Sequence, residues 1–155
     1  PLRLVGSEMC IRDSHVILRY KLERALLDGD LLVSDIPYAW NDAFESSFGI
    51  RPPDDLRGCL QDIHWYDGAI GYFPTYTLGA LAAAQLFTSL LKDHPDVLTF
   101  ISKGDFSVLL GWLRTNIHNL GSAFSTDEIM LKVTGKSLCE ADFLAHLNKR
   151  YLGVD

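Results

Sequence analysis

The chain has 155 residues, of which 48% are apolar and 22% charged, and its formal net charge at pH 7 is −6. These values are typical of a single folded domain and exclude an intrinsically disordered chain. Lys and Arg never occur more than two in a row, which argues against nucleic acid and anionic membranes as partners. The most apolar run, Leu78 to Leu91, is shorter than the ~20 residues that cross a bilayer, so it predicts a core helix.

The chain begins without a clear pattern and then becomes helical. Residues 1–14, PLRLVGSEMCIRDS, show no hydrophobic period, and we expect an irregular segment that is non-native or the edge of a longer chain. Residues 15–155 are expected to form one helical part. From His15, Leu18 and Leu22 recur at helical spacing. The charged residues take the other positions of this helix: Arg19, Lys21, Glu23, Arg24 and Asp28.

The middle of the chain predicts two further helices around an irregular connector. One begins near Asp35, has Pro37 in its first turn and ends at Gly49. The two prolines in residues 51–58, RPPDDLRG, exclude a helix interior there. Residues 77–93, TLGALAAAQLFTSLLKD, are apolar nearly all round, which favours burial among other helices.

The last third is also patterned as helices. Apolar residues between Phe106 and Leu120 mark one helix face, which Gly121 closes. Capping boxes are expected where Ser precedes Glu by three residues, at Ser125 and at Ser137. The sequence therefore predicts an all-α array of six or seven helices, with one irregular segment rich in Gly and aromatic residues that lines a cleft.

No metal or nucleophile motif is present in this chain. The five histidines are scattered, with no H-E-x-x-H or other close ligand spacing, so we assign no metal ligand to the chain. There is no G-x-S-x-G and no Gly-rich phosphate loop after a strand. The three cysteines fit no paired spacing, which predicts reduced thiols in a cytoplasmic protein.

The irregular segment, GCLQDIHWYDGAIGYFPTY at residues 58–76, concentrates polar and aromatic groups. His64 can exchange hydrogen bonds and carry a proton near neutral pH. Asp62 and Gln61 are close enough in sequence to orient its ring or a ligand, and Tyr72 and Tyr76 bring phenolic O–H donors. On the residues alone, a buried polar cluster that only joins helices explains the segment equally well.

Within that segment, Gly58, Gln61, Asp62, His64 and Trp65 form the pattern G-x-x-Q-D-x-H-W, and GYFPTYTLG follows. Both resemble motifs of the Taq-type metallocarboxypeptidases, peptidase family M32. HVILRYKLERALLDGDL, DIPYAWNDAF and VTGKSLCEADFLAHLNKRYLG are similar to the family in the same order. The resemblance covers nearly everything from His15 to the C-terminus. The family's I-R-x-x-A-D motif is not matched before His15, so nothing is carried over from it.

The resemblance implies the C-terminal part of a helical, zincin-like zinc enzyme that removes C-terminal amino acids from peptides, acts in the cytoplasm and forms homodimers. The family's H-E-x-x-H and downstream Glu ligands are absent here, so we expect this chain alone to be inactive. By resemblance, His64 and Tyr76 are candidate catalytic donors to the developing oxyanion. Gln61 and Tyr72 are candidate substrate-binding residues, and Asp62 would orient His64.

Two readings from different classes stay open at this point. The favoured one is the C-terminal part of a zinc metallocarboxypeptidase. The alternative is a non-catalytic helical domain that uses the same aromatic segment to bind a peptide or protein. A peptide is the expected partner in either case, with no nucleic acid and no membrane.

Overall fold

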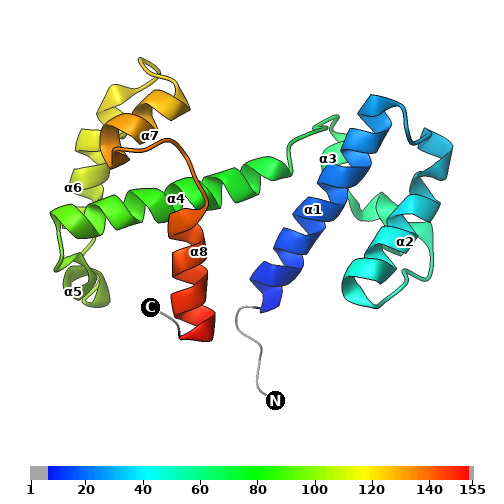
Figure 1. Cartoon of the computed structure of the whole chain (residues 1–155), viewed down its shortest axis with the longest axis horizontal. Helices are drawn as coiled ribbons and strands as arrows, with labels where there is room; N and C mark the ends of the chain where they lie inside the picture. The colour runs from blue at the N-terminus through cyan, green and yellow to red at the C-terminus, as the bar shows by residue number, and fades with distance from the viewer. Residues whose placement is uncertain (1–6, 154–155) are drawn as a thin grey trace. The chain divides into compact units, whose positions relative to one another are not determined.

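The computed structural model describes residues 7–153, and these form helices and turns without any strand (Figure 1). The chain divides into two compact units, Pro1–Thr77 and Leu78–Asp155. The predicted all-α class is confirmed. Eight α-helices are present in the described part of the chain, one more than the upper expectation, because α3 is only a single turn of four residues.

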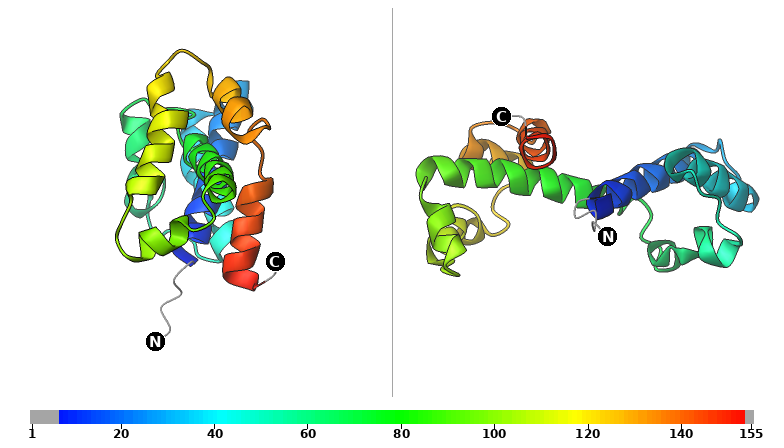
Figure 2. Two further views of the ribbon diagram at one scale, coloured as in Figure 1. Left: turned by 90° about the vertical axis from the view of Figure 1, so that its left-hand side faces the viewer. Right: turned by 90° about the horizontal axis from the view of Figure 1, so that it is seen from below.

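Unit 1 is built on two helices that lie side by side (Figures 1 and 2). Its α-helices are α1 (Ser7–Asp28), α2 (Ile36–Phe48) and α3 (Ile63–Tyr66), and its 3-10 turns are Val33–Asp35, Asp55–Arg57 and Cys59–Gln61. Leu18 and Leu22 of α1 pack with Trp40 of α2 and Cys59 in one apolar cluster. Burial of the Cys59 thiol raises its pKa. This core fixes the side of α1 that faces residues 58–76.

The second helix matches its predicted bounds, whereas the first does not. Pro37 lies in the first turn of α2, and Gly49 ends the helix in the left-handed conformation at φ 69°. The first helix was expected from His15 but begins at Ser7, so residues 7–14 are not irregular; residues 1–6 lie outside the described residues. No Gly or Pro interrupts the stretch between Gly6 and Asp28, and Glu, Met and Arg within it favour helix despite the missing apolar period.

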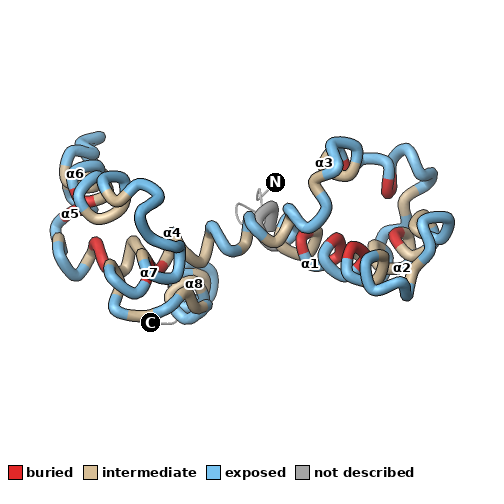
Figure 3. The backbone as a smooth tube through the Cα atoms, turned by 90° about the horizontal axis from the view of Figure 1, so that it is seen from above, coloured by how far each residue is buried: buried red, intermediate tan, exposed pale blue. Residues whose placement is uncertain are grey.

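Unit 2 contains the remaining helices. They are α4 (Pro74–Asp93), which starts four residues before the boundary, α5 (Val97–Ser102), α6 (Ser107–Asn116), α7 (Thr126–Thr134) and α8 (Ala141–Leu147), with a 3-10 turn His118–Leu120 and a π-helical end Asn148–Leu152. Leu90, Val97 and Trp112 form its buried cluster, and buried positions are few and scattered along the helices (Figure 3).

Two expectations for these helices were wrong. The apolar pattern of α4 predicted burial all round, but Leu78 is 49% exposed whereas Leu90 is 1% exposed. The pattern shows how much apolar surface the helix carries, not which part a neighbour covers. The second wrong expectation is a single helix from Phe106 to Gly121. It ends at Asn116 and continues as a 3-10 turn.

Of the two capping boxes, one forms. Ser125 accepts from the Glu128 N–H at 3.3 Å, and the Glu128 carboxylate accepts from the Ser125 N–H at 2.7 Å. The box at Ser137 does not form, because α8 begins at Ala141. The backbone before α8 is instead held by Gln85, which is 1% exposed.

Gln85 joins α4 to the loop between α7 and α8. Its side-chain N–H group lies 2.7 Å from Thr134 Oγ1 and 3.1 Å from each carbonyl oxygen of Lys136 and Ser137, while its oxygen accepts from the Cys139 N–H at 3.1 Å. Burying this amide is favourable only because its partners are satisfied.

We expect Gln85→Ala to lower the free energy of unfolding of unit 2 by about 2–4 kcal/mol, because several buried polar groups lose their partner at once. Native-state hydrogen exchange of α4 and α7 amides measures this change. Thr115→Ala, which removes only an exposed hydrogen bond within α6, is the matched control. Equal exchange in the two variants would contradict the assigned role of Gln85.

Candidate functional site

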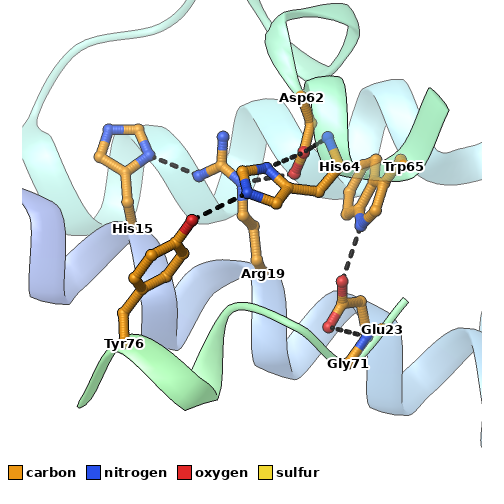
Figure 4. A network of polar contacts seen from close by, with 8 residues as sticks. All are labelled: His15, Arg19, Glu23, Asp62, His64, Trp65, Gly71 and Tyr76. Atoms are coloured by element: carbon orange, nitrogen blue, oxygen red, sulfur yellow. Dashed lines mark hydrogen bonds and ion pairs between the residues drawn. The ribbon is translucent and has the colours of Figure 1, made fainter. Parts of the chain in front are cut away.

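The candidate site lies entirely in unit 1 and rests on one side of α1 (Figure 4). His15, Arg19 and Glu23 are spaced four residues apart, so their side chains project from the same helix face. Arg19 and Glu23 are only 7% and 2% exposed. The sequence pattern had set both among the charged positions outside the apolar stripe, and the structure shows that they are buried against residues 58–76.

Arg19 and Asp62 form a buried ion pair. Arg19 Nε donates to Asp62 Oδ2 at 2.5 Å, and the two side chains are 9% and 0% exposed. The Arg19 guanidinium also lies over the rings of Trp40, at 4.7 Å, and Phe73, at 4.4 Å. Both charges are therefore matched in a desolvated setting, where an unpaired charge would be costly.

Asp62 contacts both the backbone and the ring of His64. Its Oδ1 accepts from the His64 backbone N–H at 2.9 Å, which caps the single turn of α3, and lies 3.4 Å from His64 Nδ1. A carboxylate beside Nδ1 favours the tautomer that carries its proton there. The other ring nitrogen, Nε2, then has a free lone pair on the neutral ring.

His64 and Tyr76 meet directly. His64 Nε2 lies 3.1 Å from the Tyr76 hydroxyl oxygen, so in the tautomer that Asp62 favours the Tyr76 O–H donates to Nε2. The His64 side chain is 23% exposed and Tyr76 is 38% exposed, so the pair lies at the surface of unit 1. The structure thus brings these two predicted site residues together.

Aromatic rings surround this pair. Tyr72 stacks on His64 with centroids 5.5 Å apart, Phe73 lies 4.5 Å from the same ring, and Tyr72 meets Tyr76 edge-on at 5.4 Å. Tyr72 is 47% exposed. Gln61 differs, because its amide donates to the carbonyl oxygen of Leu56 and so holds its own loop in this structure.

Two glycines, Gly58 and Gly71, are required by the backbone conformation of residues 58–76. A Cβ on Gly58 would stand 3.2 Å from Asp54 O and 3.3 Å from Pro52 Cβ, so a larger residue would push the connector away. Gly71 has φ 79°, a conformation that side chains disfavour. It points the Gly71 N–H at Glu23, whose Oε2 accepts it at 3.1 Å.

Glu23 and Trp65 complete the network. Trp65 Nε1 donates to Glu23 Oε1 at 2.8 Å, and the Trp65 ring meets Trp40 edge-on at 5.7 Å. Trp65 therefore packs against Trp40 and also donates a hydrogen bond to Glu23. The sequence signal for Glu23 was its register with Arg19 on α1, but its partners lie 42 and 48 residues away.

A pocket of about 280 Å³ lies beside the network. It is lined by Val33, Ile36, Pro37, Cys59, Leu60, Asp62, Trp65 and Tyr66. Neither His64 nor Tyr76 lines it, although the segment that carries them does. The cleft expected for residues 58–76 therefore corresponds, within unit 1, to an apolar hollow next to the polar pair.

His15 gives the network a dependence on pH. Arg19 Nη1 lies 2.8 Å from His15 Nδ1, and Phe44 and Phe48 pack against the imidazole ring. Burial, and secondarily the Arg19 charge, lower the pKa of His15 below its usual 6.5. The unfolded chain therefore binds a proton at His15 more readily than the folded chain does.

We expect the stability of unit 1 to fall as pH drops below about 6.5 towards the lowered pKa of His15, because protonation also removes the acceptor for Arg19. Above that pH the contribution of His15 is fully present. His15→Gln should lose this part of the pH dependence, which denaturant unfolding at a series of pH values measures. An unchanged pH profile in His15→Gln would refute the assignment.

Residues 7–153 offer no candidate metal centre. The described residues contain no group of three His, Cys, Asp or Glu side chains that could hold a metal ion, and the sequence has no H-E-x-x-H. We therefore assign it no metal ligand. Across residues 7–153, no helix combines the length and apolar character of a membrane span.

Known proteins resemble this chain over most of its length. It is 41% identical over 138 residues to thermostable carboxypeptidase 1 of Pyrococcus furiosus and 39% identical over 140 residues to that of Thermus thermophilus. These alignments cover 89% and 90% of this chain but 28% of each relative. The chain thus spans less than a third of the curated relatives it matches.

Solved structures of carboxypeptidases are also similar to this chain. The M32 carboxypeptidase of Deinococcus radiodurans superposes with a TM-score of 0.86 at 38% identity, over 92% of this chain and 29% of that one. Metallocarboxypeptidase 1 of Trypanosoma cruzi gives a TM-score of 0.84 at 39% identity, over 90% and 30%. The family model for the carboxypeptidase Taq (M32) metallopeptidases matches residues 8–151. The chain therefore belongs to the M32 family of metallocarboxypeptidases.

Proposed function

We propose that this chain supplies the substrate-contacting part of a metallocarboxypeptidase that releases C-terminal amino acids from peptides. The observation that carries the proposal is the His64–Tyr76 pair, held by Asp62 and Arg19 and open at the surface of unit 1. Membership of the M32 family supports the reaction class.

The chemistry of the pair suits stabilisation of a developing oxyanion. Attack on a peptide carbonyl places negative charge on its oxygen, and preorganised donors lower the barrier because they need no reorganisation. Tyr76 offers an O–H that can turn from His64 Nε2 to such an oxygen. His64 offers Nε2–H when its ring is protonated. Asp62 Oδ1 lies 3.4 Å from Nδ1, the other ring nitrogen.

We assign the roles of substrate binding to Tyr72 and, more weakly supported, to Gln61. Tyr72 is 47% exposed, its ring contacts both members of the pair, and its hydroxyl is a group that can donate to a peptide carbonyl or carboxylate. Gln61 is exposed, but its amide is used by the Leu56 carbonyl. A substrate role for Gln61 requires that this hydrogen bond be exchanged.

The metal, assembly and location are also part of the proposal. We propose zinc as the metal, which would supply an activated water when bound, with ligands that the described residues do not provide. A homodimer is proposed from the family resemblance alone. A cytoplasmic location is supported by Cys59 and Cys139, which are free thiols.

Peptide binding to the chain tests the proposal. A peptide with a free C-terminal carboxylate, at millimolar concentration, should shift the ring signals of His64 and Tyr76 in NMR spectra. The same peptide with a C-terminal amide is the control and should shift them less. Equal shifts from both peptides would favour the alternative, a helical binding domain without exopeptidase specificity, and no shift would overturn both readings.

A further inference from the structure

Glu23 is a buried carboxylate with an unusual set of partners. It is 2% exposed, and among the described residues no Lys or Arg forms an ion pair with it. Both of its oxygens instead accept from neutral donors, Oε1 from Trp65 Nε1 at 2.8 Å and Oε2 from the Gly71 N–H at 3.1 Å. Burying a charge is expensive, so two strong, charge-assisted hydrogen bonds must compensate for it.

The two donors lie on the two pieces of chain that carry the His64–Tyr76 pair. Trp65 follows His64 directly in α3, and Gly71 lies in the turn that leads to Tyr76 on α4. The same turn carries Phe73, which contacts the His64 ring at 4.5 Å. One side chain of α1, Glu23, thus links Trp65, next to His64, with Gly71, in the turn before Tyr76, as Figure 4 shows.

We propose that Glu23 is the positioning residue that sets the hydrogen bond between His64 Nε2 and the Tyr76 hydroxyl. Arg19 holds Asp62, and thereby the His64 side, whereas the Glu23 carboxylate accepts hydrogen bonds both from Trp65 on that side and from Gly71 in the turn before Tyr76. The catalytic meaning of this role rests on the proposed function, but the geometric role does not.

The chemistry requires a carboxylate rather than an amide. Gln has the same shape but only one acceptor oxygen, so its NH2 group would face either the indole N–H or the Gly71 N–H. Glu23→Gln therefore keeps the volume and breaks one link. A residue that served only to fill space would tolerate this change.

The test uses the whole 155-residue chain. The chemical shifts of the His64 ring nitrogens are measured by 1H–15N NMR at a pH at which the ring is neutral. Tyr76→Phe defines the signal of a His64 ring that has lost its partner. We expect Glu23→Gln to move the His64 Nε2 signal most of the way to that position. Glu45→Gln, at an exposed carboxylate of α2 paired with Arg51, should leave it unchanged.

A second variant covers the case in which Glu23→Gln does not fold. Trp65→Phe retains an aromatic ring but removes the indole donor together with part of the ring volume, and it should shift the same Nε2 signal in the same direction. If the folded variants show the wild-type His64 signal while Tyr76→Phe shifts it, the positioning role is overturned. This outcome is independent of peptide binding, so it is distinguishable from failure of the proposed function.

Discussion

Asp62→Ala is expected to lower the free energy of unfolding of unit 1 by about 3–5 kcal/mol, because the Arg19 charge would remain buried without its partner. The same substitution removes the cap of α3 and the contact with His64 Nδ1. Native-state hydrogen exchange of α1 amides measures the loss.

The control is to remove both charges together. Arg19→Met/Asp62→Leu should cost much less than Asp62→Ala, because apolar replacements often match a buried ion pair in stability. Arg24→Ala, at the exposed pair with Asp28 on the same helix, should leave the exchange rates of α1 unchanged. A double variant as unstable as Asp62→Ala would show that the loss does not come from an unpaired charge.

The second large effect is expected for Tyr76→Phe, on the kcat of a chimeric enzyme. In it, residues 8–151 of this chain replace the aligned segment of the Pyrococcus furiosus thermostable carboxypeptidase 1. Tyr76→Phe in the chimera should lower kcat roughly 10²-fold, the typical effect of removing one donor from a developing oxyanion. KM should change little, because the aromatic ring and its contacts with Tyr72 and Phe73 remain.

Tyr38→Phe is the matched control, since Tyr38 lies on α2 outside residues 58–76, is 71% exposed and does not line the pocket. It should leave kcat unchanged. A Tyr76→Phe chimera whose kcat equals that of the unmodified chimera would exclude Tyr76 as a transition-state donor. A rise in KM alone would instead make Tyr76 a substrate-binding residue.

Local sequence signals predicted what local interactions determine. Gly49 ends α2 and Ser125 caps α7 because each acts through its own backbone neighbours. The His64–Tyr76 contact spans only 12 residues, so a motif could reveal it. The start of α8 could not be predicted in this way, because Gln85, 54 residues before Cys139, accepts the Cys139 N–H that a Ser137 cap would have used.

The roles of Arg19 and Glu23 in the site could not be predicted from the sequence, for the same reason. Arg19 and Glu23 look like solvent-facing charges of an amphipathic helix, and charged residues are seldom buried. They are buried because Asp62, Trp65 and the Gly71 N–H offer partners 42 to 48 residues away. A helical period cannot reveal such partners. The register of both residues with His15 was the only available sign.

The measurement that tests the central claim most directly is peptide hydrolysis by the unmodified chimera beside its His64→Ala variant. We expect the chimera to release the C-terminal amino acid from a peptide, to leave the C-terminal amide of the same peptide intact, and to lose most of this activity with His64→Ala. A folded chimera that is inactive, or one whose activity survives His64→Ala, would contradict the claim that residues 58–76 form the substrate-contacting wall of a carboxypeptidase.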